Sequence, residues 1–136
     1  MDGFTMEANA TISVVAQFIE ACDTVDRNTM EACLSHDVLA DVTQADGSVI
    51  TLAGRNAYMN AIDAMGIETV RHSITATQIA AVADDQAMAM VEIKAERKGR
   101  QLHNFAAFLM RVKAGQIERI WMVDALPEES DRFWKR

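Results

Sequence analysis

Two residues far apart in the sequence, Asp23 and His72, have side chains that could carry out acid–base chemistry together. Asp23 falls inside the apolar stripe of a predicted helix, close to Ile12 and Ile19 on a helical wheel. His72 falls near the start of a predicted strand, on the same face as Ile74. A histidine paired with a carboxylate is a general base or acid that works near neutral pH. This combination predicts a site for proton transfer.

Both residues also have an ordinary structural interpretation. Asp23, near the end of its helix, can lean into solvent or cap the turn that follows. His72 can be a rim residue whose hydrogen bonds are satisfied by its neighbours. The sequence leaves these alternatives open.

Three predicted strands supply a second group of candidates, which we expect to form one wall of a cavity. Alternation along the strands assigns a set of apolar and polar side chains to this wall. An apolar wall with a few converging polar atoms is typical of a small-molecule pocket. The alternative is an ordinary helix-on-sheet core with polar residues at its open rim. The predicted wall consists of Met88, Met90, Phe108, Met110 and Met122 with the polar residues Glu92, Asn104 and Asp124.

The elements that must position these residues change their hydrophobic period once along the chain. Helical spacing comes first and strand-like alternation follows, with short turns between the last four strands, which is typical of an antiparallel meander. We therefore expect an α+β fold in one domain over residues 1–136. The pattern predicts helices over 8–25, after Asp26 and over 54–66, and strands over 38–43, 49–52, 70–82, 86–96, 102–112 and 117–124.

The predicted sheet is apolar on both faces, because residues 87–91 and 105–110 lose the alternation of apolar and polar side chains. Helices would cover one face, and a second copy of the chain is the commonest cover for the other. We therefore expect a homodimer formed through the outer face of the sheet. His103 and Trp121 would lie on the side that meets the partner, where aromatic rings often anchor interfaces.

Composition excludes several classes of function. Thirteen Lys and Arg against twenty Asp and Glu give a formal net charge of −7, which argues against binding to a nucleic-acid backbone. No apolar run approaches the length of a membrane span, and no Cys or His spacing resembles a zinc site. Two cysteines cannot form a disulfide framework, so a cytoplasmic protein is expected. Nothing in the sequence implies a metal or an organic cofactor.

The order of these elements resembles the nuclear transport factor 2-like (NTF2-like) superfamily, and several local strings resemble its SnoaL-like branch. This resemblance implies a cone in which a curved sheet wraps a long first helix around a cavity. The superfamily includes polyketide cyclases, ketosteroid isomerase and scytalone dehydratase as well as non-catalytic members. The strings are 18–23 (FIEACD), 34–38 (LSHDV), 54–57 (GRNA), 71–74 (RHSI), 82–87 (VADDQA) and 111–117 (RVKAGQI).

The resemblance implies roles for the candidate residues. Asp23 and His72 stand at the positions of the Asp–His pair of the dehydratase-like branch, while Phe18 replaces the tyrosine expected five residues before the aspartate. The ketosteroid isomerase pattern fits worse, because its hydroxyl donor also falls at Phe18 and its protonated acid falls near Phe108. His72 would be the general base, Asp23 would hold its ring, and Asn104 would donate to a developing enolate.

Three functional hypotheses follow from these observations. The leading one is a protein that binds a hydrophobic, polyketide- or steroid-like molecule and, if it is an enzyme, acts as an isomerase, cyclase or dehydratase with His72, Asp23 and Asn104 as its catalytic residues. Phe18 would join the predicted wall in contacting the ligand, and Glu92 and Asp124 would be secondary polar candidates. The alternatives are a non-catalytic hydrophobic ligand binder and a dimeric interaction module.

Overall fold

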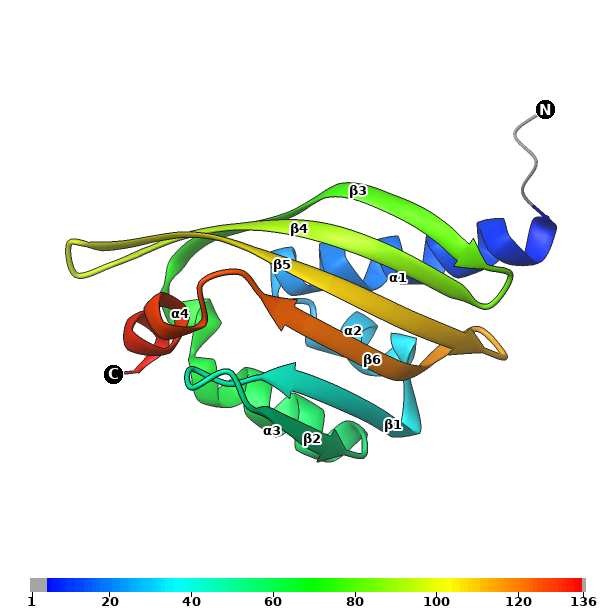
Figure 1. Ribbon diagram of the computed structural model, residues 1–136, viewed down its shortest axis with the longest axis horizontal. Coiled ribbons are helices and arrows are strands. Elements are labelled where there is room, and N and C mark those ends of the chain that lie inside the picture. The colour runs from blue at the N-terminus through cyan, green and yellow to red at the C-terminus, as the bar shows by residue number, and fades with distance from the viewer. Residues whose placement is uncertain (1–4, 136) are drawn as a thin grey trace.

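A long N-terminal helix opens the structure, a computed structural model that describes residues 5–135 (Figure 1). Helix α1 spans Met6–Thr24, and the Thr5 hydroxyl caps its start by accepting a hydrogen bond from the Ala8 amide. Helix α2 spans Arg27–Cys33 and is capped by the Asp26 carboxylate. Helix α3 spans Arg55–Met65 and is followed by a short 3-10 turn, η1, over Ile67–Thr69. The three predicted helices are confirmed.

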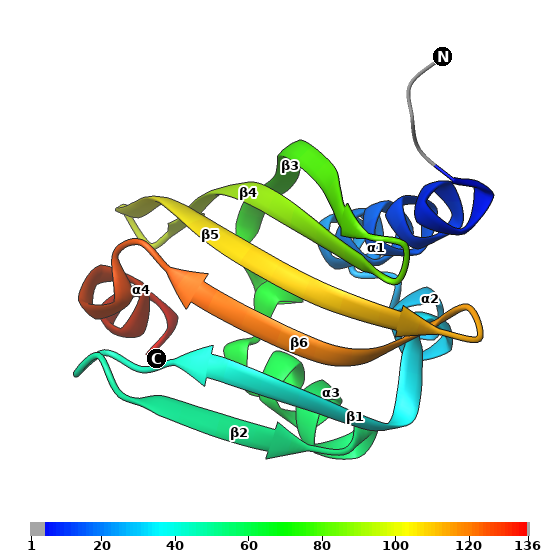
Figure 2. The ribbon, with the colours of Figure 1, turned by 45° about the vertical axis from the view of Figure 1, so that its right-hand side comes forward.

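The six strands form one sheet in the order β2-β1-β6-β5-β4-β3 (Figure 2). All neighbours pair antiparallel except β1 and β6, which are parallel. The meander β3 to β6 was predicted from its short turns, whereas the β1–β6 pairing that joins it to the first hairpin was not. The strands are β1 Leu34–Thr43, β2 Val49–Ala53, β3 Arg71–Ala83, β4 Gln86–Arg97, β5 Arg100–Lys113 and β6 Gln116–Asp124.

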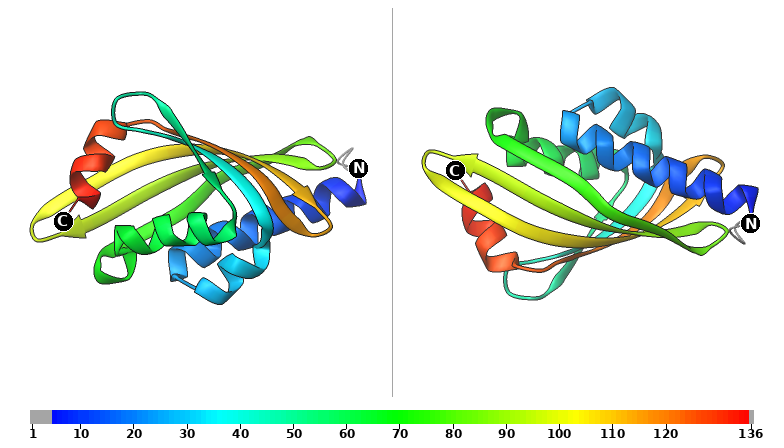
Figure 3. Two further views of the ribbon diagram at one scale, coloured as in Figure 1. Left: turned by 90° about the horizontal axis from the view of Figure 1, so that it is seen from below. Right: turned by 90° about the horizontal axis from the view of Figure 1, so that it is seen from above.

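The helices α1, α2 and α3 lie together on one face of the curved sheet (Figure 3). Helix α1 packs mainly against the edge strand β3 and also covers β4. Its N-terminal half is tied to the β3–β4 turn, because the buried Thr11 hydroxyl donates to the Asp84 carbonyl at 2.7 Å. The core between helices and sheet includes the fully buried side chains Val15, Phe18, Met30, Leu34, Val38, Val91, Met110, Ile117 and Ile120.

Strand β4 presents alanines to the helices and methionines to solvent. Ala87 and Ala89 are fully buried, whereas Met88 is 47% exposed and Met90 is 39% exposed. The prediction that Met88, Met90 and Glu92 share the cavity face is therefore wrong. The physical reason is the register of the β4–β5 hairpin, which pairs Ala89, and not Met88 or Met90, with Phe108.

A fourth helix, α4 at Pro127–Trp134, follows the last strand and was not predicted. It lies at the end of the sheet formed by the β4–β5 hairpin (Figure 1). Phe133 is buried there with Val70, Ala95 and Leu102. The Arg97 guanidinium lies 5.4 Å from the centre of the Phe133 ring, a cation–π contact that adds to this packing.

In the part of the chain that the structure describes, no helix is both long enough and apolar enough to cross a lipid bilayer.

Candidate functional site

The helix-covered face of the sheet borders a partly enclosed apolar cavity of about 190 Å³. Helices α1, α2 and α3 with the turn η1 supply one side of its wall, and strands β1 to β6 supply the other. Nearly every lining side chain is apolar, and the wall contains no carboxylate, imidazole, amine or guanidinium in residues 5–135. The lining residues are Phe18, Ile19, Cys22, Met30, Val42, Leu52, Tyr58, Ala61, Ile62, Met65, Ile67, Ile74, Val91, Ile93, Phe108, Met110 and Met122.

Four of the residues predicted to form the cavity wall or contact the ligand lie in this wall: Phe18, Phe108, Met110 and Met122. Phe18 projects from α1, Phe108 from β5 and Met122 from β6, which is paired with β5 so that Phe108 lies opposite Met122. Their position is as the sequence predicted, and their contact with a ligand stays a prediction.

His72 and Asp23 are brought together, but not as a catalytic pair. The His72 Nε2 lies 2.7 Å from the main-chain oxygen of Asp23, and its Nδ1 lies 2.9 Å from the main-chain oxygen of Val70. The Asp23 carboxylate instead accepts a hydrogen bond from the Ile74 amide at 2.8 Å. The prediction that the Asp23 carboxylate holds the histidine ring is therefore wrong for this structure.

This arrangement fastens α1 to the edge strand β3. Ile74 donates to Asp23 rather than to a neighbouring strand, so the carboxylate covers part of the sheet edge. Both ring nitrogens of His72 face carbonyl oxygens, and neither residue lines the apolar cavity. A general base needs a free nitrogen lone pair directed at the substrate, which His72 lacks here.

Asn104 and Asp124 form a structural cluster outside the cavity wall. The buried Asn104 donates from Nδ2 to the Asp124 carboxylate at 2.6 Å and accepts from the Phe105 amide. The same oxygen of Asp124 accepts from the Leu126 amide at 2.8 Å. These bonds hold the turn between β6 and α4 and occupy the Asn104 amide, and Asn104 is not among the residues that line the cavity, so its predicted role as a donor to the ligand is not supported.

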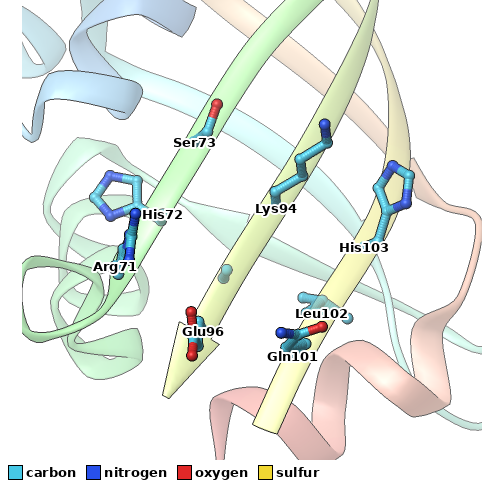
Figure 4. Close-up of a pocket in the computed structure, with 9 residues that line it drawn as sticks. Arg71, His72, Ser73, Lys94, Glu96, Gln101, Leu102 and His103 are labelled. Carbon is cyan, nitrogen blue, oxygen red and sulfur yellow. The ribbon is translucent and has the colours of Figure 1, made fainter. Parts of the chain in front are cut away.

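Glu92 lies on the outer face, where its carboxylate is 2.7 Å from His103 Nε2. Beside it, strands β3, β4 and β5 border a polar hollow of about 500 Å³ (Figure 4). Its charged side chains, among them Arg71, Lys94 and Glu96, are exposed and are spread along the strands rather than directed at one point. The hollow is larger than the apolar cavity, but it is open to solvent. A small ligand bound there would bury little of its surface.

Tyr58 lies in the cavity wall, although it was not predicted to do so. Its ring packs against Phe18 with centroids 6.1 Å apart, and the residue is 7% exposed. Burial raises the pKa of its hydroxyl above the usual range, so the hydroxyl is neutral. A signal was present, because Tyr58, Ile62 and Met65 recur at helical spacing and must share one face of α3.

Cys22 is the other side chain in the wall that can donate a hydrogen bond. Burial raises the pKa of its thiol to about 12, which keeps the sulfur protonated and uncharged. The thiol is 3.8 Å from the Met30 sulfur, toward which it donates. The cavity is thus neutral as well as apolar.

The sequence of residues 15–120 matches the family model of the SnoaL-like domain. This segment runs from the middle of α1 into β6 and includes most of the cavity wall. The chain belongs to the SnoaL-like domain family. The resemblance noted in the sequence is confirmed at the level of family and fold.

Solved structures show how closely this SnoaL-like chain follows the NTF2-like fold. Bal32a, from a soil-derived mobile gene cassette, matches with a TM-score of 0.82 and 18% identity over 95% of this chain and 99% of that chain. A proposed SnoaL-like polyketide cyclase from Jannaschia sp. CCS1 matches with a TM-score of 0.80 and 9% identity over 100% and 99%. An LEH-like epoxide hydrolase from M. tuberculosis matches with a TM-score of 0.71 and 15% identity over 90% and 88%.

No curated protein sequence matches the chain. At the identities of the structural relatives, the likeness establishes a shared fold, and a fold hosts many unrelated activities. The function must therefore be argued from the cavity itself.

Proposed function

We propose that this SnoaL-like domain binds a small, uncharged, predominantly apolar molecule in the cavity between α1, α3 and the sheet. The observation that carries the proposal is the partly enclosed volume of about 190 Å³ with its apolar, neutral wall. Burial of apolar ligand surface there would supply the binding free energy, at about 25 cal/mol per Å². The wall offers no group that could pair with a charged ligand.

The cavity volume sets the size of the ligand. An apolar cavity of about 150 Å³ holds benzene, and sites for drug-sized ligands run from about 300 to 1,000 Å³. At about 190 Å³, the cavity fits one ring or a short branched chain. This supports a smaller ligand than the polycyclic, polyketide- or steroid-like molecule that the sequence suggested.

Binding is better supported than catalysis by His72 and Asp23. Proton abstraction inside the cavity would need a base in its wall, and residues 5–135 supply none there. For His72 to reach a ligand, its ring would have to leave both carbonyl partners. The polyketide cyclase and epoxide hydrolase names of the relatives therefore inform the fold more than the chemistry of this chain.

Filling the cavity tests the proposal. Ala61 lies in the wall on α3, and Ala64 lies on the exposed side of the same helix. We expect the A61F variant to lose at least about tenfold in affinity for methylenecyclohexane, because its ring occupies the cavity, and A64F to keep wild-type affinity. The measurement is an NMR titration that follows methyl shifts of lining residues such as Ile74. Equal affinity of A61F and A64F contradicts the proposal.

We also propose that a second copy of the chain covers the outer face of the sheet. Cross-strand neighbours build an outer apolar patch there, since Met88 pairs with Leu109, which pairs with Trp121. Exposed apolar surface of this kind, bordered by charged groups, is typical of interfaces. The outer apolar patch consists of Met88, Met90, Phe105, Ala107, Leu109, Trp121 and Val123.

Charge favours a second copy as the partner on this patch. The chain carries −7 overall, yet acids and bases are equal in number at each end of the patch. Two copies can therefore meet there without net repulsion, although the rest of the surface is acidic. The bordering residues are Arg71, Glu92, Lys94 and Glu96 at one end, and Asp41, Arg111, Glu118 and Arg119 at the other.

A further inference from the structure

We infer that the Tyr58 hydroxyl is a hydrogen-bond donor reserved for the cavity ligand, which is an uncharged molecule with one acceptor oxygen, such as a ketone or ether, on an apolar body. The inference rests on the proposed function, because it names the chemical class of molecule that the cavity takes. It goes further because it assigns to one residue the selectivity for a ligand with an oxygen over a pure hydrocarbon.

The Tyr58 hydroxyl has no hydrogen-bond partner in the part of the chain that the structure describes. Its side chain is 93% buried and lines the cavity, and the only ionisable group that influences it is Cys22. The thiol of Cys22 is itself directed at the Met30 sulfur. Because no protein group takes up this donor and the residue lines the cavity, the hydroxyl is free to donate to an oxygen of a ligand placed beside it.

The remaining wall limits the ligand to a single acceptor. Apart from Tyr58, the lining side chains carry no oxygen or nitrogen atom, and their only heteroatoms are the sulfurs of Cys22 and the methionines. A second polar group on the ligand would therefore be buried without a partner. Sugars, polyols and diacids are excluded on this ground.

Charge on the ligand is excluded by the same wall. The nearest titratable side chains, Tyr58 and Cys22, are both held neutral by burial, since burial raises the pKa of each. A carboxylate or ammonium entering the cavity would meet neither an opposite charge nor a set of donors sufficient to replace water. The acceptor on the ligand is therefore a neutral oxygen, and the ligand itself is a small, weakly polar molecule.

The test uses two ligands of the same shape that differ only in the acceptor. Cyclohexanone and methylenecyclohexane both place one ring in the cavity, and only the first has an oxygen. For each protein variant, NMR titration gives the ratio of the methylenecyclohexane Kd to the cyclohexanone Kd. Comparing this ratio between variants cancels the different solvation of the two ligands in water.

The decisive variant is Y58F, which keeps the ring against Phe18 and removes the hydroxyl. We expect the ratio to fall on the order of tenfold in Y58F relative to wild type, through weaker cyclohexanone binding and unchanged methylenecyclohexane binding. The matched control is S73A, which removes a hydroxyl from the exposed side of β3, outside the cavity wall, and should leave the ratio unchanged. Amide spectra of both variants verify that the fold is kept.

The outcomes separate the inference from the proposed function. If both ligands bind but the ratio is the same in wild type and Y58F, or falls in S73A instead, the role of Tyr58 is overturned and the binding cavity stands. If neither ligand binds the wild-type protein, the proposed function fails and the inference fails with it.

Discussion

Asp23 and His72 show how much chemistry depends on which atoms of a residue are used. Their positions predicted proximity, and the structure places them in contact. The contact runs through the main-chain oxygen of Asp23, however, while its carboxylate takes the Ile74 amide. Residue types and spacing bring side chains to one region, but they do not determine which acceptor a donor chooses when a backbone carbonyl lies nearby.

Tyr58 illustrates the opposite case at the same scale. Its spacing with Ile62 and Met65 was readable from the sequence, and the sequence contains no other tyrosine. What the sequence did not reveal is that the hydroxyl is left without a partner, because that depends on Cys22 and Met30 from other helices. A polar side chain can serve a ligand only where no protein group takes its hydrogen bond, and the fold decides which groups lie near it.

Helix α1 and strand β3 form a unit whose main polar fastening is Asp23. We expect Asp23→Ala to lower the free energy of unfolding by about 1–2 kcal/mol, because the Ile74 amide loses its acceptor at a partly buried edge. Asp23→Asn keeps an oxygen at the same position and should lose less than half as much. Urea unfolding of the two variants and the wild type measures this. Equal losses in both variants would mean that the negative charge, rather than the acceptor, matters.

The strand registers explain which parts of the sheet could be predicted. The turn at Lys98-Gly99 has positive φ at both residues and pairs Arg97 with Arg100. This pairing sets the register of the hairpin, so that each odd-numbered residue of β4 lies opposite an even-numbered residue of β5. Applied to the sequence, this rule would have placed Ala89, not Met90, beside Phe108. The β5–β6 register is different, because an irregularity after Arg111 shifts the pairing by one residue.

Helix α4 was beyond sequence reasoning for a related reason. Residues 127–134 carry few apolar side chains, so their helix depends on tertiary support rather than on a long periodic pattern. Phe133 provides that support by packing with Val70 and Leu102, which come from distant parts of the chain. The fold class, the three leading helices and the meander were readable because each has a strong local period.

At the scale of the whole molecule, the two faces of the sheet have different surroundings. Its inner face closes a neutral cavity with the helices, and its outer face carries the apolar patch bordered by balanced charges. The proposed assembly and the proposed ligand binding would therefore use opposite sides of the same strands. A substitution on one side can be designed to leave the other unchanged, which makes the two proposals separately testable.

The proposed dimer predicts a clear response to charge in the outer apolar patch. We expect the L109K variant to be monomeric at concentrations where the wild type is a dimer, because a lysine at the centre of the patch would be buried unpaired. A64K is the matched control, since Ala64 is exposed on helix α3 and does not lie on the outer face of the sheet. Analytical ultracentrifugation gives the masses. A wild-type monomer, or an L109K dimer, argues against assembly through this face.

The central claim is that the cavity between α1, α3 and the sheet holds a small neutral ligand. A crystal structure of the wild-type protein grown with cyclohexanone tests it most directly. The account predicts electron density for one ligand ring enclosed by Phe18, Phe108 and Met122, with the ketone oxygen within hydrogen-bonding distance of the Tyr58 hydroxyl. A cavity that is collapsed, filled by ordered water, or empty while the ligand lies elsewhere on the protein would contradict it.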